Sequence, residues 1–139
     1  MPYRLISLFL TLIFLLFALL QYNDPEPFFW GGVYLMVAFF HLSAAYNKPR
    51  LLPSIIGTVV SLLGAISLWP SEYLGIVDDM NTGTPQIELA RESLGLAVAS
   101  FSLCFLSLKA YKDQRVATSQ LNGKEQNSQA LATPEYDHQ

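Results

Sequence analysis

Four long stretches of the chain contain no Asp, Glu, Lys or Arg, and no other feature of the sequence constrains the fold as strongly. They cover residues 5–23, 27–47, 51–71 and 93–108, which together make 77 of the 139 residues. The other 62 residues carry all 19 charged side chains. A soluble domain distributes charge over all its exposed faces, so this pattern excludes one. The density of Leu, Phe, Ile and Val in the four stretches excludes a disordered chain.

The lengths of these stretches indicate membrane-spanning helices. A helix rises about 1.5 Å per residue, so about 20 residues cross a hydrocarbon core of about 30 Å. In lipid every backbone N–H and C=O needs a partner within the protein, which favours helices. The sequence therefore predicts an all-α membrane protein whose four transmembrane helices form an antiparallel bundle within residues 1–111. The predicted spans cover about residues 4–22, 28–46, 51–69 and 90–110.

The segments that flank the fourth span differ from it in composition. Pro85 suits the first position of a helix and Thr84 suits its N-cap, so we expect this helix to begin outside the bilayer. Residues 112–139 are polar and rich in Gln, Ser and Asn. Such a segment buries little apolar surface, so we expect a disordered C-terminal tail.

Basic residues gather on one side of the predicted bundle. With four spans, seven Lys and Arg residues lie at the level of the two termini and the second connection, and Arg91 alone lies on the opposite side. Because Lys and Arg are retained on the cytoplasmic side, both termini are expected to be cytoplasmic, in a bacterial inner membrane or a plasma membrane. Aromatic residues near the ends of the runs agree with interfacial positions. These are Tyr22, Trp30, Trp69 and Tyr73 on the outer side and Tyr3, Tyr46 and Tyr111 on the inner side.

Acidic residues on the outer side form the main candidate site. Glu88, Arg91 and Glu92 follow the i, i+3, i+4 spacing of one helix face, and Asp24 and Glu26 lie at the same level between the first two spans. One interpretation is a structural ion-pair network centred on Arg91. A second is a Ca²⁺ or Mg²⁺ site, because all four carboxylates offer the oxygen ligands that these ions prefer. A catalytic carboxylate pair or a ligand-binding vestibule is the third.

Small residues predict where the helices approach one another. Gly95 and Ala99 continue the charged face of the fourth span inward, and Gly57, Ser61 and Ala65 repeat at the same spacing in the third span. Small residues four positions apart let a second helix pack closely. We therefore expect both stripes to face the interior of the bundle.

A possible intramembrane polar site comprises His41, Thr58 and Cys104. His41 is expected to be neutral and bonded to a hydroxyl of the third or fourth span, and a proton-relay or ligand-binding role is the alternative. Cys104 is the only cysteine, which rules out an intramolecular disulfide and a cysteine-based zinc site. We expect it to be a small, buried packing residue.

The outer motif Gln21-Tyr22-Asn23-Asp24-Pro25-Glu26-Pro27-x-x-Trp30 resembles the signature of the transmembrane protein 220 family, which comprises small four-helix membrane proteins. The segment Glu88-x-x-Arg91-Glu92-x-x-Gly95-Leu96 is a second match, and the resemblance covers about residues 4–110. It implies a four-helix fold and marks the two outer motifs, but it implies no reaction. The family more often has Asp at the position of Glu26; Glu keeps the charge on a longer side chain, so no metal geometry is carried over from the family.

The expected function is non-enzymatic: a small multi-pass membrane protein that acts as a binding or accessory module through an ordered outer polar cap. The cap comprises Gln21, Tyr22, Asn23, Asp24, Glu26, Trp30, Glu88, Arg91 and Glu92. The alternative is an ion or small-ligand transporter, or a membrane enzyme, that uses the outer carboxylates with Arg91. Expected partners are the lipid bilayer and another membrane protein or a second copy; without a basic stripe, nucleic acid is excluded. No cofactor is predicted, and the alternative is a divalent cation held by Asp24, Glu26, Glu88 and Glu92.

Overall fold

The computed structural model describes residues 2–46, 50–74, 76 and 85–132. In these residues the chain forms helices and no strands. The helices are α1 (Pro2–Leu20), the short 3₁₀ helix η1 (Gln21–Asn23), α2 (Pro27–Ala45), α3 (Leu51–Ser67) and α4 (Pro85–Ala132). The all-α fold predicted from the four charge-free stretches is confirmed, and α4 begins at Pro85 as expected. Thr84, its predicted N-cap, lies outside the described residues.

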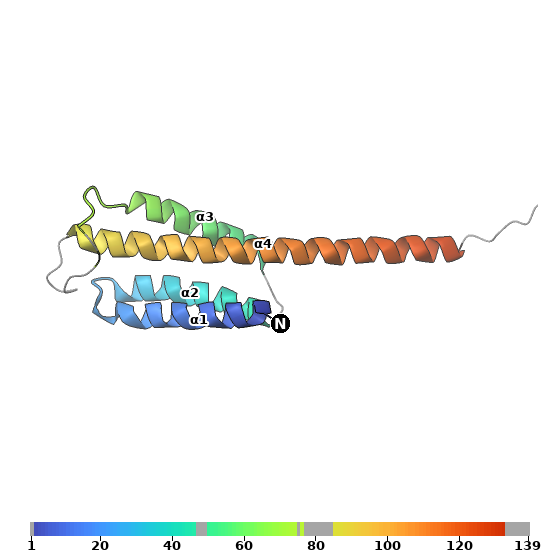
Figure 1. Cartoon of the computed structure of the whole chain (residues 1–139), viewed down its shortest axis with the longest axis horizontal. Helices are drawn as coiled ribbons and strands as arrows, with labels where there is room; N and C mark the ends of the chain where they lie inside the picture. The colour runs from blue at the N-terminus through green and yellow to red at the C-terminus, as the bar shows by residue number, and fades with distance from the viewer. Residues whose placement is uncertain (1, 47–49, 75, 77–84, 133–139) are drawn as a thin grey trace, which may run out of the picture.

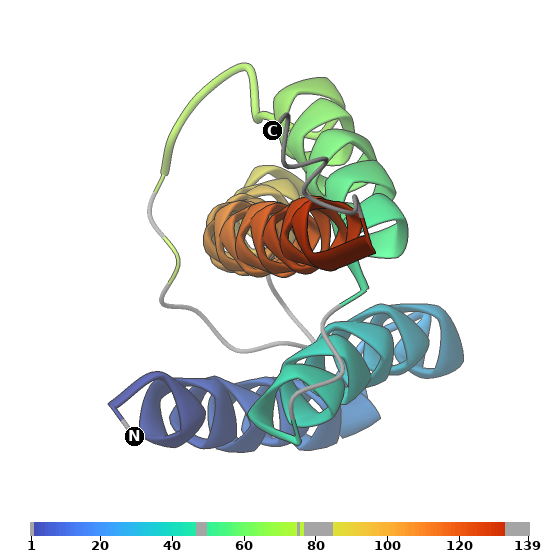
Figure 2. The ribbon, with the colours of Figure 1, turned by 90° about the vertical axis from the view of Figure 1, so that its right-hand side faces the viewer.

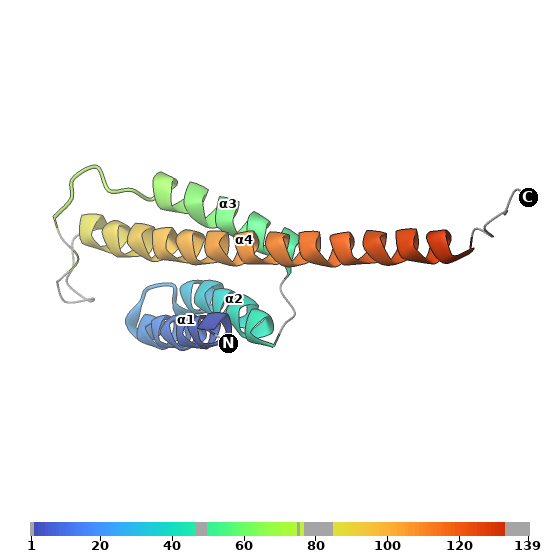
Figure 3. The same cartoon turned by 45° about the vertical axis from the view of Figure 1, so that its right-hand side comes forward.

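The helices form two antiparallel hairpins that lie against each other. α1 packs mainly against α2, and α3 packs mainly against α4 (Figure 1). Seen along the long axis, α4 lies between α3 and the first hairpin (Figure 2). A rotated view shows the same order and shows α4 extending well beyond the other helices (Figure 3). η1 and the start of α4 lie at the same end of the bundle, so the two outer motifs are neighbours (Figure 1).

The helices have the length and apolarity that a bilayer requires. Three segments qualify as membrane spans: Tyr3–Asn23, Pro27–Ala45 and Pro85–Gln129, with hydropathies of 2.4, 1.5 and 1.6. The fourth helix, α3, is also apolar but has 17 residues. At about 1.5 Å per residue this gives about 25 Å, near the lower limit for crossing a hydrocarbon core. The protein is thus a multi-pass membrane protein.

Aromatic residues fill the space between the first hairpin and α4. Phe14 of α1 is fully buried, and its ring packs against those of Tyr34 and His41 in α2, with centroids 6.3 and 5.9 Å away. Ala99 and Leu103 of α4 complete this core cluster. Phe14 therefore links both helices of the first hairpin to the second.

Small residues line the contact between α3 and α4, as predicted. A Cβ atom on Gly57 would lie 2.9 Å from Leu103 Cδ1, and one on Gly64 would lie 2.8 Å from Leu96 Cδ1. Ser61 and Ala65 are buried in the same interface. The Gly-Ser-Ala stripe of the third span therefore faces the interior of the bundle, as the spacing predicted.

Two serines of α4 bind α3 through its backbone. The hydroxyl of Ser93, which is fully buried, donates to the carbonyl oxygen of Ala65 at 2.7 Å, and that of Ser100 donates to the carbonyl oxygen of Thr58 at 3.0 Å. In lipid the hydrophobic effect does not drive helices together, so hydrogen bonds of this kind contribute to the association of α3 with α4.

The structure has a helix over residues 112–132, within the segment expected to be a disordered tail. α4 continues as a helix to Ala132 and is exposed over residues 111–129, and residues 133–139 of the expected tail lie outside the described residues. A segment with few apolar residues cannot form a core of its own. It can still continue a helix that is already formed, because extension has no new nucleation cost. Ala, Gln, Lys, Arg and Glu sustain that extension. An ion pair between Lys109 and Asp113, one turn apart, supports the exit of α4 from the bundle.

The serine bonds to α3 predict a measurable loss of stability. Ser93→Ala should lower the free energy of unfolding by about 0.6–1.7 kcal/mol, the range for hydrogen bonds between membrane helices. Unfolding by SDS titration in mixed micelles, followed by circular dichroism, measures this difference. The matched control is Ser119→Ala in the exposed part of α4, where we expect a change within about 0.5 kcal/mol. Equal effects of the two substitutions would contradict the assignment.

Candidate functional site

The turn after α1 fixes the position of Asp24. The backbone N–H of Asp24 donates to the carbonyl oxygen of Gln21 at 3.0 Å, which closes η1. The Asp24 carboxylate then accepts a bond from the backbone N–H of Glu26 at 2.9 Å. Pro25 and Pro27 restrict the backbone on either side. The short polar connection therefore holds the Asp24 side chain in a defined position at the outer end of the bundle.

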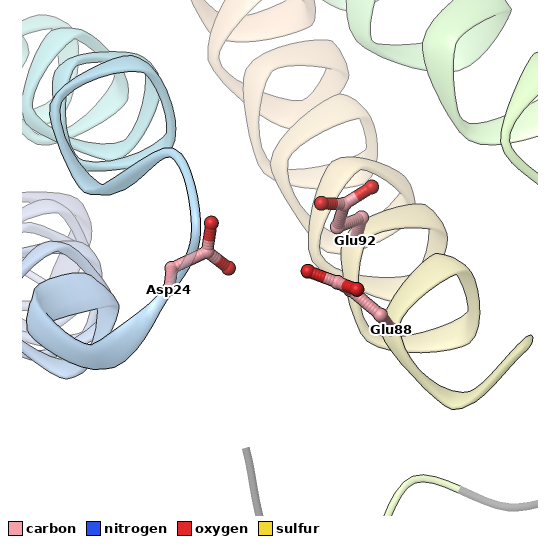
Figure 4. A group of neighbouring side chains, drawn as sticks. All are labelled: Asp24, Glu88 and Glu92. Atoms are coloured by element: carbon pink, nitrogen blue, oxygen red, sulfur yellow. The ribbon is translucent and has the colours of Figure 1, made fainter. Parts of the chain in front are cut away.

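Two acidic residues of α4 lie opposite Asp24. Glu88 and Glu92 are one turn apart on the same face of α4, and both side chains point toward Asp24 across the gap between the hairpins (Figure 4). One carboxylate oxygen from each of the three residues lies within 4.8 Å of the others. We call Asp24, Glu88 and Glu92 the acidic cluster. Glu26, the fourth carboxylate predicted to share the site, is exposed and does not join this group.

A cavity of about 400 Å³ lies beside the acidic cluster, between α1, α2 and α4. Its polar lining consists of Gln21, Asn23, Asp24, Tyr34, Glu88, Arg91 and Glu92. Apolar groups complete the wall: Phe17, Leu20, Pro25, Ile76, Leu94, Gly95 and Val98. Val98 lies six residues beyond Glu92, or about 9 Å along the helix. The cavity therefore extends from the outer polar cap toward the interior of the bundle.

Tyr34 of α2 contacts α4 at Gly95, beside the cavity. A Cβ atom on Gly95 would lie 1.9 Å from the Tyr34 hydroxyl oxygen, so only glycine permits this approach. Tyr34 is 3% exposed, and its ring packs edge-on against that of Phe17 with the centroids 5.6 Å apart. The predicted packing role of Gly95 and Ala99 is met, since Ala99 is fully buried.

Arg91 and Trp30 support the cap from different sides. The Arg91 side chain lines the cavity, and its Nε–H donates to the backbone carbonyl of Ile76 at 3.2 Å, which attaches the connection after α3 to α4. The Trp30 side chain lies beside that of Glu92. Trp30 is 5% exposed and thus belongs to the core, although its place in the sequence suggested the lipid interface. Tyr22 is exposed and takes no part in lining the cavity.

No hydrogen bond joins His41, Thr58 and Cys104, the residues of the possible intramembrane polar site, in the part of the chain that the structure describes. His41 is buried, as expected, but neither ring nitrogen has a hydrogen-bond partner among the described residues, so its predicted bond to a hydroxyl is wrong. The Thr58 hydroxyl instead donates to the carbonyl oxygen of Ser54 in its own helix. Cys104 is exposed rather than buried, which corrects its assignment as a packing residue.

Tyr34 and Phe17 are the aromatic cavity residues that the sequence did not single out. Both lie inside charge-free stretches, where aromatic residues are common and most of them face lipid or the core. The available signal was the spacing of Trp30, Tyr34 and His41 on one helical face, which places three polar-tipped rings toward the interior of the bundle.

Comparison with known proteins supports the fold. Residues 13–108 match the family model described as "Transmembrane family 220, helix". The chain belongs to this family. The match includes the acidic cluster, Tyr34 and Gly95, and ends before the exposed part of α4. No curated protein and no solved structure matches this member of transmembrane family 220.

The contact between Tyr34 and Gly95 predicts the effect of adding one methyl group. Gly95→Ala should destabilise this member of transmembrane family 220, because overpacking costs about 1–3 kcal/mol, whereas the gain in helix propensity is about 1 kcal/mol. SDS titration measures the difference, and adding Tyr34→Phe should restore part of the loss. Gly32→Ala is the control, since no atom lies within 4 Å of its added Cβ. It should leave stability unchanged or raise it. A loss with Gly32→Ala equal to that with Gly95→Ala would contradict the account.

Proposed function

We propose that this protein is a non-enzymatic binding module of the membrane that takes a positively charged ligand into its outer cavity. The observation that supports the proposal is the acidic cluster at the mouth of a cavity of about 400 Å³. Cavities that bind small molecules are typically about 300–1,000 Å³ in volume. The cap is built from a rigid turn and a helix end, so it presents the cluster without a large rearrangement.

Electrostatics favours a cation at this position. The three carboxylates converge from two separate elements and are partly buried, so their mutual repulsion is screened less than at an open surface. A cation among the three oxygens removes that repulsion. Ca²⁺ or Mg²⁺ is one class of such ligand, since Gln21 and Asn23, whose side chains carry amide oxygens, also line the cavity.

The alternative function is transport of an ion or small ligand, or membrane catalysis, with the acidic cluster and Arg91 as the working groups. The inward reach of the cavity to Val98 favours this alternative over a purely structural cap. A transporter must also open toward the inner end, which a binding module does not require. Uptake of a bound cation by proteoliposomes would therefore separate the two functions. Association with another membrane protein or a second copy would use the exposed apolar faces of the hairpins.

The orientation we propose has both termini in the cytoplasm and the acidic cluster outside. The excess of Lys and Arg at the level of the termini supports it. At that end, Arg4 lies over the ring of Tyr46 and Lys109 over the ring of Tyr3, with 5.7 and 4.8 Å to the ring centroids. Pairs of a cation with an aromatic ring suit the headgroup level, where one partner is wet and the other is apolar.

Removing one carboxylate should weaken cation binding. Asp24→Asn keeps an oxygen that can accept the bond from Glu26 N–H, so the turn should remain intact while one charge is lost. A bond to a charged group is worth about 1.5–3 kcal/mol, which corresponds to at least a tenfold loss of affinity. Calorimetric titration of Ca²⁺, Mg²⁺ and a small ammonium ion into protein-loaded nanodiscs measures this change. The control Glu72→Gln removes an acid of the same side that does not line the cavity. Absence of binding by every cation would contradict the proposal.

Reporter fusions test the orientation. A reporter that is active only outside the cytoplasm should be silent when fused after residue 112 and active when fused after residue 74. The reverse pattern would overturn the proposed topology without affecting the geometry of the cavity.

A further inference from the structure

We infer that the ligand of the outer cavity is an ammonium group carried on an apolar body. This inference rests on the proposed function and specifies its ligand. The charge would lie among the acidic cluster, and the body would lie against the apolar floor, which we define as Phe17, Leu94 and Val98.

The size and lining of the cavity favour such a ligand over a bare metal ion. A Ca²⁺ site is compact, with oxygen ligands about 2.3–2.6 Å from the ion. An ion held by the acidic cluster would occupy only the mouth of a cavity of about 400 Å³. The apolar floor would be left without a partner, whereas an apolar body would fill the space and gain from leaving water.

The Tyr34 hydroxyl provides a second and independent indication of a ligand. Tyr34 is 97% buried and lines the cavity. Its hydroxyl makes no hydrogen bond to the described residues, and it is not among the side-chain atoms that are closed off completely, so it is reached from the cavity. Polar groups of buried side chains are usually hydrogen-bonded, so this hydroxyl is available to a polar group that enters the cavity. A primary ammonium has three N–H donors. It can therefore serve two carboxylates of the acidic cluster and the Tyr34 oxygen together.

The ring faces next to the cluster suit the same chemistry. Phe17 and Tyr34 pack edge-on, so two aromatic rings at nearly right angles form part of the wall. A cation within about 6 Å of a ring centroid is attracted to the ring face, and an apolar body packs well on the same surface. Neither feature contributes to the binding of a hydrated metal ion.

An ammonium on an apolar body has two natural sources. One is a membrane lipid with an ethanolamine headgroup, because the cavity lies near the outer interface and is lined by apolar groups. The other is a soluble arylalkyl or alkyl amine. Both present the same group to the acidic cluster, so the experiment must distinguish them by the lipid composition of the membrane.

The first arm of the test compares charged and uncharged probes of equal shape. The protein in phosphatidylcholine nanodiscs is titrated with 2-phenylethylamine, with 2-phenylethanol and with Ca²⁺. We expect binding of the amine at least tenfold tighter than binding of the alcohol. Tyr34→Phe should weaken amine binding several-fold, and Glu92→Gln should weaken it at least tenfold. Tyr22→Phe, an exposed residue of the same cap, is the control and should have no effect.

The second arm repeats the amine titration with phosphatidylethanolamine or phosphatidylglycerol in the nanodiscs. Competition by phosphatidylethanolamine alone assigns the ammonium to a lipid headgroup, and unchanged binding assigns it to a soluble amine; both results support the inference. Binding of Ca²⁺ without binding of the amine would overturn the inference and leave the proposed function standing. If neither the amine nor Ca²⁺ binds, the inference and the proposed function are both overturned. If Tyr34→Phe does not fold, Glu92→Gln and the uncharged probe still decide.

Discussion

The two helical hairpins meet where Tyr34 of α2 lies against Gly95 of α4, and this close approach sets the geometry of the outer site. Phe14 packs on the same Tyr34 ring from α1, so three helices converge on one side chain. The contact brings the turn after α1 to the face of α4 that carries Glu88 and Glu92. The outer cavity lies beside this contact, and both its acidic cluster and its aromatic wall depend on the same separation of the helices.

Much of the fold could be predicted because a bilayer leaves few alternatives. Backbone groups in lipid must be paired internally, so apolar stretches of sufficient length become helices, and α1 to α4 follow. Helical spacing also placed Glu88 and Glu92 on one face with Gly95, and the structure has them so. For Asp24, the sequence predicted only that it lies at the same membrane level as Glu88 and Glu92. Sequence spacing does not give distances between separate helices, so their close approach could not be predicted.

Other features depend on helix rotation and on cooperative effects that single residues do not reveal. A serine or threonine in a membrane helix can donate its hydroxyl bond to the backbone of its own helix, as Thr58 does. The presence of hydroxyl groups near His41 in the sequence therefore did not establish that one of them bonds to it. Rotation of α4 turns Cys104 outward, and rotation of α2 turns Trp30 inward, although their positions in the sequence suggested the reverse. The helix continues to Ala132 because extension from a formed helix is easier than folding of a separate segment.

The central claim is that the turn after α1 and the start of α4 come together around one cavity. Cross-linking of introduced cysteines tests it most directly, in a Cys104→Ser background that removes the only native cysteine. Asp24→Cys combined with Glu92→Cys should be joined rapidly by a short bismaleimide in native membranes. Tyr22→Cys combined with Glu92→Cys, which places one thiol on the exposed side of the same turn, should react far more slowly. Equal rates for the two pairs, or no reaction of the first pair, would contradict the account.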